Sequence, residues 1–151
     1  LRCFEFLANI ADQSHHVTGV VADKFRIELI AGELSLRPNV LLEVNVSGEA
    51  AKDGFTAESL TAAWPNIAGY EHVQVKGLMT MAPYSPDPES SRPYFQRLRE
   101  LRDRLANKSS DKVTLPELSM GMSGDFEVAI EEGATIVRIG RTLYEGLPQD
   151  R

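Results

Sequence analysis

Two turns late in the sequence carry residues that could bind a small anion. Ser123 and Gly124 follow a short, mostly apolar run, and Gly140, Arg141 and Thr142 follow a β-branched run. Backbone N–H groups in turns of this kind commonly bind phosphate. The alternative is that the glycines only allow tight turns. We predict a phosphate site where the two turns meet.

An arginine inside the second run favours the phosphate site over simple turns. Arg138 stands between Val137 and Ile139, in a run whose β-branched residues predict a strand. A buried arginine requires a partner. Small residues at both run ends, together with this internal arginine, are the pattern that indicates an anion site.

The segment between the two turns predicts the unit that positions them. We expect a strand at 117–122, a helix at 126–132 capped by Gly133, and a second strand at 135–139. The apolar side of that helix is expected to consist of Phe126, Ala129 and Ile130. Two parallel strands joined by a helix end at the same edge of a sheet. In (β/α)8 barrels, the loops after the last two strands are the usual phosphate site.

The preceding residues repeat the alternation of strand and helix. We expect strands at 17–22, 40–47 and 73–81, and helices at 23–36, from Thr56 to about Pro65, and from about Pro93 to Leu105. Thr56 is the expected N-cap of the second helix, and Pro65 is expected to end or kink it. Five alternating strands require a parallel sheet covered by helices, so we expect an α/β fold.

The spacing of residues along the sequence predicts the buried side of three helices and one shared face of a strand. The expected buried sides of the helices are Phe25, Leu29, Ile30 and Leu34, then Leu60, Ala63 and Trp64, then Phe95, Leu98, Leu101 and Leu105. Glu43 and Asn45 share one face of the strand at 40–47. In a closed barrel this face would point inward, towards the anion site; alternatively it is exposed to solvent.

Size, charge and cysteine content exclude several functional classes. The 151 residues, 42% of them hydrophobic, suffice for one domain, and the net charge of −6 argues against a nucleic-acid surface. Cys3 is the only cysteine and suggests a reducing compartment, and no apolar run could span a membrane. We expect a cytoplasmic protein without a metal site, because His15 and His16 have no partner cluster. Because Leu1 is not methionine, we expect a fragment or a processed product.

Four motifs, in order and at matching spacing, resemble those of a known family. They are VNVSGEAAKDGF (44–55), KGLMTMAP (76–83), LSMGMSGDFEVAIEEG (118–133) and VRIGRTLYEG (137–146). Together they are similar to the pyridoxal phosphate homeostasis proteins. The resemblance covers about Val20 to Gly146 and leaves residues 1–16 unmatched.

The resemblance implies a fold and a cofactor. The chain would be a single partial domain, 1–151, made of the C-terminal five βα units of a (β/α)8 TIM barrel of the alanine racemase type, an incomplete barrel. Pyridoxal 5′-phosphate (PLP) would bind at the carboxyl ends of the strands.

The resemblance also assigns roles within that PLP site. Ser123 and the backbone near Met122 would bind the phosphate, together with Gly140 and the residue after it. Arg138 would face the pyridine nitrogen. After Gly140 many relatives carry threonine, whereas this chain has Arg141 with Thr142 beside it.

One feature of the family has no counterpart in the sequence. Family members attach the cofactor to a lysine on their first strand, and no lysine here stands in that motif: neither Lys24, Lys52, Lys76, Lys108 nor Lys112. Lys52 instead matches a lysine in a later loop. We expect a PLP-binding homeostasis protein that keeps the phosphate site, lacks the covalent anchor and is not an enzyme.

Two other readings remain open. One is a racemase-like PLP enzyme, or another barrel enzyme acting on a phosphorylated metabolite, although no residue stands out as its catalytic base. The other is a truncated chain that serves only as a folding or pairing module. Whichever reading holds, the two open edges of an incomplete barrel predict that the isolated chain either self-associates or is only loosely folded.

Overall fold

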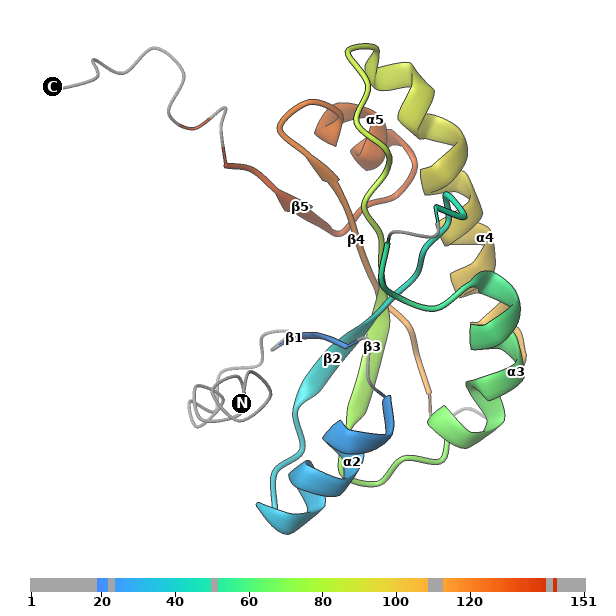
Figure 1. The fold of residues 1–151 in the computed structure, drawn as a ribbon, viewed down its shortest axis with the longest axis vertical. Coiled ribbons are helices and arrows are strands. Elements are labelled where there is room, and N and C mark those ends of the chain that lie inside the picture. The colour runs from blue at the N-terminus through green and yellow to red at the C-terminus, as the bar shows by residue number, and fades with distance from the viewer. Residues whose placement is uncertain (1–18, 22–23, 50–51, 109–112, 141–142, 144–151) are drawn as a thin grey trace, which may run out of the picture.

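The computed structural model describes residues 19–21, 24–49, 52–108, 113–140 and 143. Its strands form one parallel sheet in chain order (Figure 1). They are β1 (Gly19–Val21), β2 (Asn39–Glu43), β3 (Gln74–Met79), β4 (Glu117–Met122) and β5 (Ile136–Arg138). The expected α/β class and five-stranded parallel sheet are confirmed. All carboxyl ends of the strands therefore lie at one edge.

Helices alternate with these strands. They are α2 (Lys24–Glu33), α3 (Ala57–Ile67), α4 (Arg92–Lys108) and α5 (Phe126–Glu131), and a 3-10 helix, η2 (Pro88–Ser91), precedes α4. Helices α3 and α4 lie on the same side of the sheet (Figure 1). None of the helices in the described part of the chain is long and apolar enough to cross a membrane.

The main core lies between the sheet and the helices α3 and α4. Leu42, Leu78 and Leu118 pair in register across three strands and are buried on this side. The expected apolar stripe of α4 faces them and is confirmed, because its members are almost completely buried: Phe95, Leu98, Leu101 and Leu105. The residues that follow the three leucines, Glu43, Met79 and Ser119, are again in register and point to the opposite face.

The N-cap of α3 is confirmed, but its predicted end is not. The amide of Ser59 donates to the Thr56 hydroxyl at 3.1 Å. The helix continues to Ile67, so Pro65 does not end it. Pro65 stands in the last turn, where the missing N–H group removes one hydrogen bond of the helix only.

Helix α2 buries a different side from the one that was expected. Leu29 and Leu34 are 64% and 48% exposed, whereas Ile30 and Ala31 are buried. Ala31 contacts Val40 in a small cluster of its own, which brings the helix onto the sheet through its smallest side chain. The helix also ends at Glu33, before the position near 36 that the sequence suggested. Phe25 belongs to the predicted side, but its side chain lies outside the described residues.

Helix α5 also differs from the prediction. Ile130 is 54% exposed, while Val128 and Ala129 are buried. The cause is the close approach of α5 to β4, since a Cβ on Gly121 would stand 2.5 Å from the Cβ of Ala129. Gly133 ends the helix with φ +92°, so its predicted cap role is confirmed.

Strand β2 ends earlier than expected, and the last part of its motif forms a turn. The side chain of Asn45 donates to the carbonyl of Glu49 at 2.7 Å and accepts from the amide of Gly48 at 2.9 Å. An asparagine that satisfies a local turn in this way does not continue a strand. The prediction that Asn45 shares an inward strand face with Glu43 is therefore wrong for Asn45.

A β-bulge separates the two halves of β3. Val40 pairs with Val75, but the next residue, Leu41, pairs with Gly77, so Lys76 is an extra residue in β3. Before the bulge Val75 packs against the core, and after it Leu78 does.

Strands β3 and β4 approach each other closely just after the bulge. Gly77 pairs with Glu117, and a Cβ at Gly77 would stand 1.8 Å from the carbonyl oxygen of Glu117. Only glycine fits at this position.

Candidate functional site

The two predicted anion-binding turns meet at the carboxyl edge of the sheet. The amide of Gly140 donates to the Ser123 hydroxyl at 3.3 Å. Met122, Ser123, Arg138 and Gly140 line one cavity of ≈ 270 Å³. The structure thus brings four of the predicted site residues together. The other two, Arg141 and Thr142, lie outside the described residues.

The loop after β3 forms the opposite wall of this cavity. Its lining residues are Ala82, Pro83, Tyr84 and Ser85. Tyr84 is 85% exposed, an unusual environment for a large aromatic side chain. The sequence indicated only a proline-rich loop here. The parallel strand order was the signal that could have placed it in the site, because the end of β3 must lie beside the end of β4.

Arg138 enters the cavity from β5 and is held by neutral oxygen atoms. One guanidinium nitrogen donates to the Ser119 hydroxyl at 2.7 Å and another to the backbone carbonyl of Thr80 at 3.1 Å. Among the described residues, no carboxylate lies within salt-bridge distance of it. Burial lowers the pKa of Arg138, and the more distant charges of Asp125 and Glu43 oppose that shift. Its positive charge therefore remains available to a ligand.

The residues that support Arg138 are well fixed. Ser119 and Thr80 are 3% and 1% exposed. The Thr80 amide donates to the carbonyl of Ser119 at 3.1 Å, and its hydroxyl donates to the carbonyl of Val44 at 2.7 Å. Three adjacent strands thus hold the guanidinium, which the sequence did not indicate.

Glu43 lies on the same face as Ser119 and confirms the predicted inward side of β2 at this one position. Burial is the largest cause that raises the pKa of Glu43; the charge of Asp53 adds to it and Arg138 opposes it. A carboxylate near Arg138 that resists ionisation leaves the arginine's charge less neutralised than an ordinary glutamate would.

The turn after β4 already binds a carboxylate. Asp125 occupies the N-cap position of α5 but makes no capping bond; its Oδ1 accepts from the amide of Met122 at 2.7 Å instead. The Met122 amide, which the resemblance assigns to the phosphate, would have to exchange one anionic partner for another. The role of Met122 stays a prediction, as do the roles of Ser123, Arg138 and Gly140.

Lys52 lies beside the loop that forms the second wall. Its Nζ donates to the carbonyl of Met81 at 3.4 Å and forms an ion pair with Glu49. This places an amine next to Ala82 at the cavity wall. No group of three or more His, Cys, Asp or Glu side chains within the described ranges could hold a metal ion.

Proteins of a known family are similar in sequence to this chain over most of its length. The alanine racemase N-terminal domain family matches residues 5–148. A pyridoxal phosphate homeostasis protein of Aquifex aeolicus is 56% identical over 106 residues, which are 70% of this chain and 46% of the relative. One of Synechocystis sp. is 34% identical over 129 residues, 85% of this chain and 58% of the relative. The chain spans about half the length of these curated relatives.

Solved structures have a similar fold. PipY of Synechococcus elongatus, in a structure described as having PLP bound, superposes with a TM-score of 0.69 and 32% identity over 79% of this chain and 54% of PipY. An alanine racemase of Clostridium difficile superposes with a TM-score of 0.65 over 87% of this chain and 36% of the racemase; at 19% identity it shows the fold alone. The sheet described above is thus part of an alanine-racemase-like TIM barrel. Because the family model of the alanine racemase N-terminal domain matches residues 5–148, the chain belongs to that family.

Proposed function

We propose that this chain binds PLP and serves in PLP homeostasis rather than in amino-acid turnover. The observation that carries the proposal is the position of Arg138, whose hydrogen-bond partners among the described residues are all neutral and which lines the same cavity as Ser123 and Gly140. The names of the relatives, and the PLP bound to PipY, support the choice of ligand.

The residues present fit the chemistry of PLP. An anionic phosphate fits the turn contact between Ser123 and Gly140, where backbone donors lie at the ends of parallel strands. A flat, mostly apolar ring fits the opposite wall of Ala82, Pro83 and Tyr84. The cavity volume of ≈ 270 Å³ lies just under the range of about 300 to 1,000 Å³ that is usual for small-molecule sites.

The chemistry of Arg138 supports the non-catalytic role. PLP supplies catalysis as an electron sink, which is strongest when its pyridine nitrogen is protonated. Arg138 carries a positive charge and offers donors only, so it disfavours a second cationic donor opposite it. A site built around this arginine holds the cofactor while it weakens the property that amino-acid chemistry requires.

Replacement of Gly140 tests the position of the phosphate. No atom of the described residues, chain neighbours aside, lies within 4 Å of a Cβ built on Gly140, so Gly140→Val should fold normally. The new side chain would occupy space at the cavity and is expected to weaken PLP binding, measured by absorbance titration, at least tenfold, about 1.4 kcal/mol. Gly69→Val is the control, because a Cβ there makes ordinary contacts of 3.4 and 3.8 Å in a turn outside the lining of this cavity.

Borohydride reduction tests how the cofactor is held. After reduction of the chain with stoichiometric PLP, peptide mass mapping should find only scattered labelling of lysines. One dominant label, at Lys52 for instance, would show that an anchoring amine exists and would overturn the non-covalent part of the proposal. A racemisation assay on the same sample decides between a cofactor-binding protein and an enzyme.

Two further expectations stay predictions. The outer strands β1 and β5 of the described sheet each pair on one side only, which supports self-association, to be measured by sedimentation.

A cytoplasmic location rests on the single cysteine in the sequence and is checked by fractionation.

A further inference from the structure

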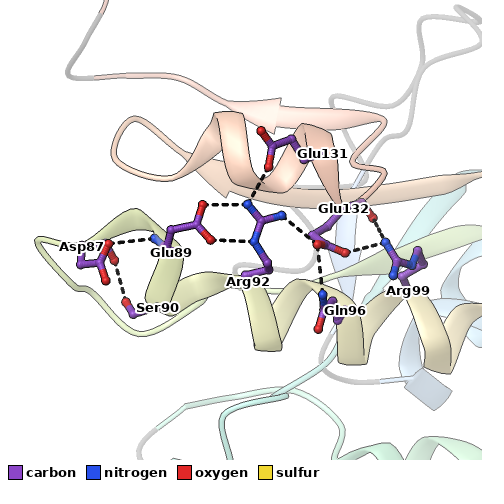
Figure 2. Close-up of polar contacts among 8 residues, drawn as sticks. All are labelled: Asp87, Glu89, Ser90, Arg92, Gln96, Arg99, Glu131 and Glu132. Carbon is purple, nitrogen blue, oxygen red and sulfur yellow. Dashed lines mark hydrogen bonds and ion pairs between the residues drawn. The ribbon is translucent and has the colours of Figure 1, made fainter.

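A dense group of charges lies outside the lining of the cavity. Arg92, the first residue of α4, contacts three carboxylates (Figure 2). Its Nε and one terminal nitrogen donate to the two oxygens of Glu89 at 2.7 Å each, and the terminal nitrogens also reach Glu131 at 2.6 Å and Glu132 at 2.9 Å. Arg92 therefore joins η2 to the end of α5.

Glu132 is the most buried member of this group. Its side chain is 8% exposed, and it receives further bonds from Gln96 at 3.1 Å and Arg99 at 2.6 Å (Figure 2). A carboxylate at the C-terminal end of a helix is disfavoured by the helix dipole. The arginines compensate for that position, and the hydrogen bond from Arg92 is the largest cause of the lowered pKa of Glu132.

The group is connected to one wall of the cavity by short bonds along the chain. The hydroxyl of Ser85, a lining residue, accepts from the amide of Asp87 at 3.2 Å. Asp87 in turn accepts from the amide of Glu89 at 3.2 Å. Glu89 then holds Arg92. Consecutive hydrogen bonds thus connect the loop 82–85 to Arg92.

The group is connected to the other wall through α5. The helix has only six residues, so its two ends lie about 9 Å apart. Glu131 and Glu132 stand at its end, while Asp125, just before its start, holds the amide of Met122 beside the lining residue Ser123. A short rigid helix transmits a displacement of its end to its start.

We propose that Arg92 is a positioning residue that fixes the separation between the two walls of the cavity. The loop 82–85 and the turn 122–125 follow the neighbouring strands β3 and β4. In the described part of the chain, Arg92 bonds to Glu89, beyond the loop, and to Glu131 and Glu132, at the far end of the helix that follows the turn. The PLP part of this inference rests on the proposed function; the geometric part does not.

Two variants of Arg92 and a stability-matched control test the effect on the ligand. Arg92→Met keeps an unbranched stem without donors, and Arg92→Lys keeps the charge without the planar fork. Leu60 is a buried residue of α3, so Leu60→Val should lower stability without a direct effect on either wall of the cavity. We expect Arg92→Met to weaken PLP binding about tenfold and to shift the ³¹P resonance of bound PLP at saturation, with Arg92→Lys intermediate. Leu60→Val should leave both unchanged.

A second measurement needs no ligand. Nitroxide labels at Tyr84→Cys and Gly124→Cys, with Cys3→Ser to remove the native thiol, report the separation of the walls by dipolar broadening in EPR spectra; Tyr84 lines the loop wall, is 85% exposed and takes no part in the bonds to Arg92. Arg92→Met should widen the distance distribution, and Leu60→Val should not.

The outcomes separate the two proposals. If the unmodified chain binds no PLP, the proposed function fails, and the labels still decide whether Arg92 holds the walls. If the chain binds PLP but Arg92→Met matches Leu60→Val in affinity, ³¹P shift and label distance, the arginine is merely a structural ion pair and the inference is wrong.

Discussion

Two arginines in this molecule are held in opposite ways. Arg92 contacts three carboxylates, and these hydrogen bonds raise its pKa further above its usual value. Arg138 contacts a hydroxyl and a carbonyl, and burial lowers its pKa. The charge of Arg92 is neutralised by ion pairs inside the protein, whereas the described residues give Arg138 no ion pair. An arginine surrounded by acids serves the fold, and one surrounded by neutral oxygens remains able to serve a ligand.

The largest expected effect removes the close strand approach on which Arg138 depends. Arg138 spans from β5 to carbonyl and hydroxyl groups of β3 and β4, and Gly77 allows those two strands to pair. In Gly77→Ala the methyl group would collide with the carbonyl of Glu117. We expect a loss of more than about 4 kcal/mol in the free energy of unfolding, measured by urea denaturation.

Gly124→Ala is the matched control for that change, because a Cβ there would have no atom of the described residues within 4 Å, chain neighbours aside, and φ is not positive. Equal stability of the two variants would show that β3 and β4 can separate at little cost.

The second expected effect removes the acid that Arg92 and Arg99 share. Glu132→Ala leaves two guanidinium groups facing each other next to a helix end, without the carboxylate between them. We expect the free energy of unfolding to fall by about 2 to 4 kcal/mol. Glu127→Ala, an exposed residue on the same helix, is the control. A fall no larger than that of the control would mean that the ion group adds nothing to stability.

The third expected effect sharpens the contrast between the two arginines. In Arg138→Met the protein no longer buries a cation, which offsets the two acceptors left without a donor, so stability should change by no more than about 1 kcal/mol. PLP affinity should nevertheless fall at least tenfold, or about 1.4 kcal/mol. Calorimetric unfolding and a PLP titration on the same sample measure both. A large loss of stability with unchanged affinity would reverse the roles assigned to Arg138 and Arg92.

The smallest expected effect is a difference in pH dependence between two glutamates. The pKa of Glu132 is lowered in the folded chain, so its contribution to stability is present above the unfolded value of about 4.3 and is lost as pH falls through the folded pKa. The pKa of Glu43 is raised, so its contribution is present below about 4.3 and is lost as pH rises through the folded pKa.

Unfolding measured from pH 3 to pH 7 checks this. Glu43→Gln should gain stability relative to the unmodified chain as pH rises, and Glu132→Gln should lose it. The same sign for both variants would contradict the assignment.

The sequence predicted the parts of the fold that depend on local pattern. The stripe of Phe95 and Leu98 has one possible buried side, because most of the other residues of α4 are charged. The meeting of Ser123 with Gly140 followed from two parallel strands that end at one edge. Helix α2 has apolar residues around more than one side, so only packing against Val40 selects Ala31 over Leu29.

The sequence did not predict the contacts between distant segments. Glu132 and Arg92 are 40 residues apart, and an arginine on a charge-rich helix is ordinarily solvated. The acceptors of Arg138 could not be predicted either, because the pattern of side chains does not indicate which backbone carbonyl, such as that of Thr80, will accept a hydrogen bond. Asp125 stands at the N-cap position of α5, yet it accepts from the Met122 amide in a local turn, a contact that the sequence did not indicate.

The extra residue in β3 determines which side chains in the second half of that strand face the helices. Val75 and Leu78 both face the helices although they are three positions apart, and alternation alone would place them on opposite sides. Lys76 absorbs the odd step. Deletion of Lys76 would leave Val75 and Leu78 two positions apart, and both would still face the helices. A regular ladder that paired Lys76 with Leu41 would instead turn Leu78 out of the core and Met79 into it. The bulge therefore decides which side chains after it face the core and which face the ligand side of the sheet.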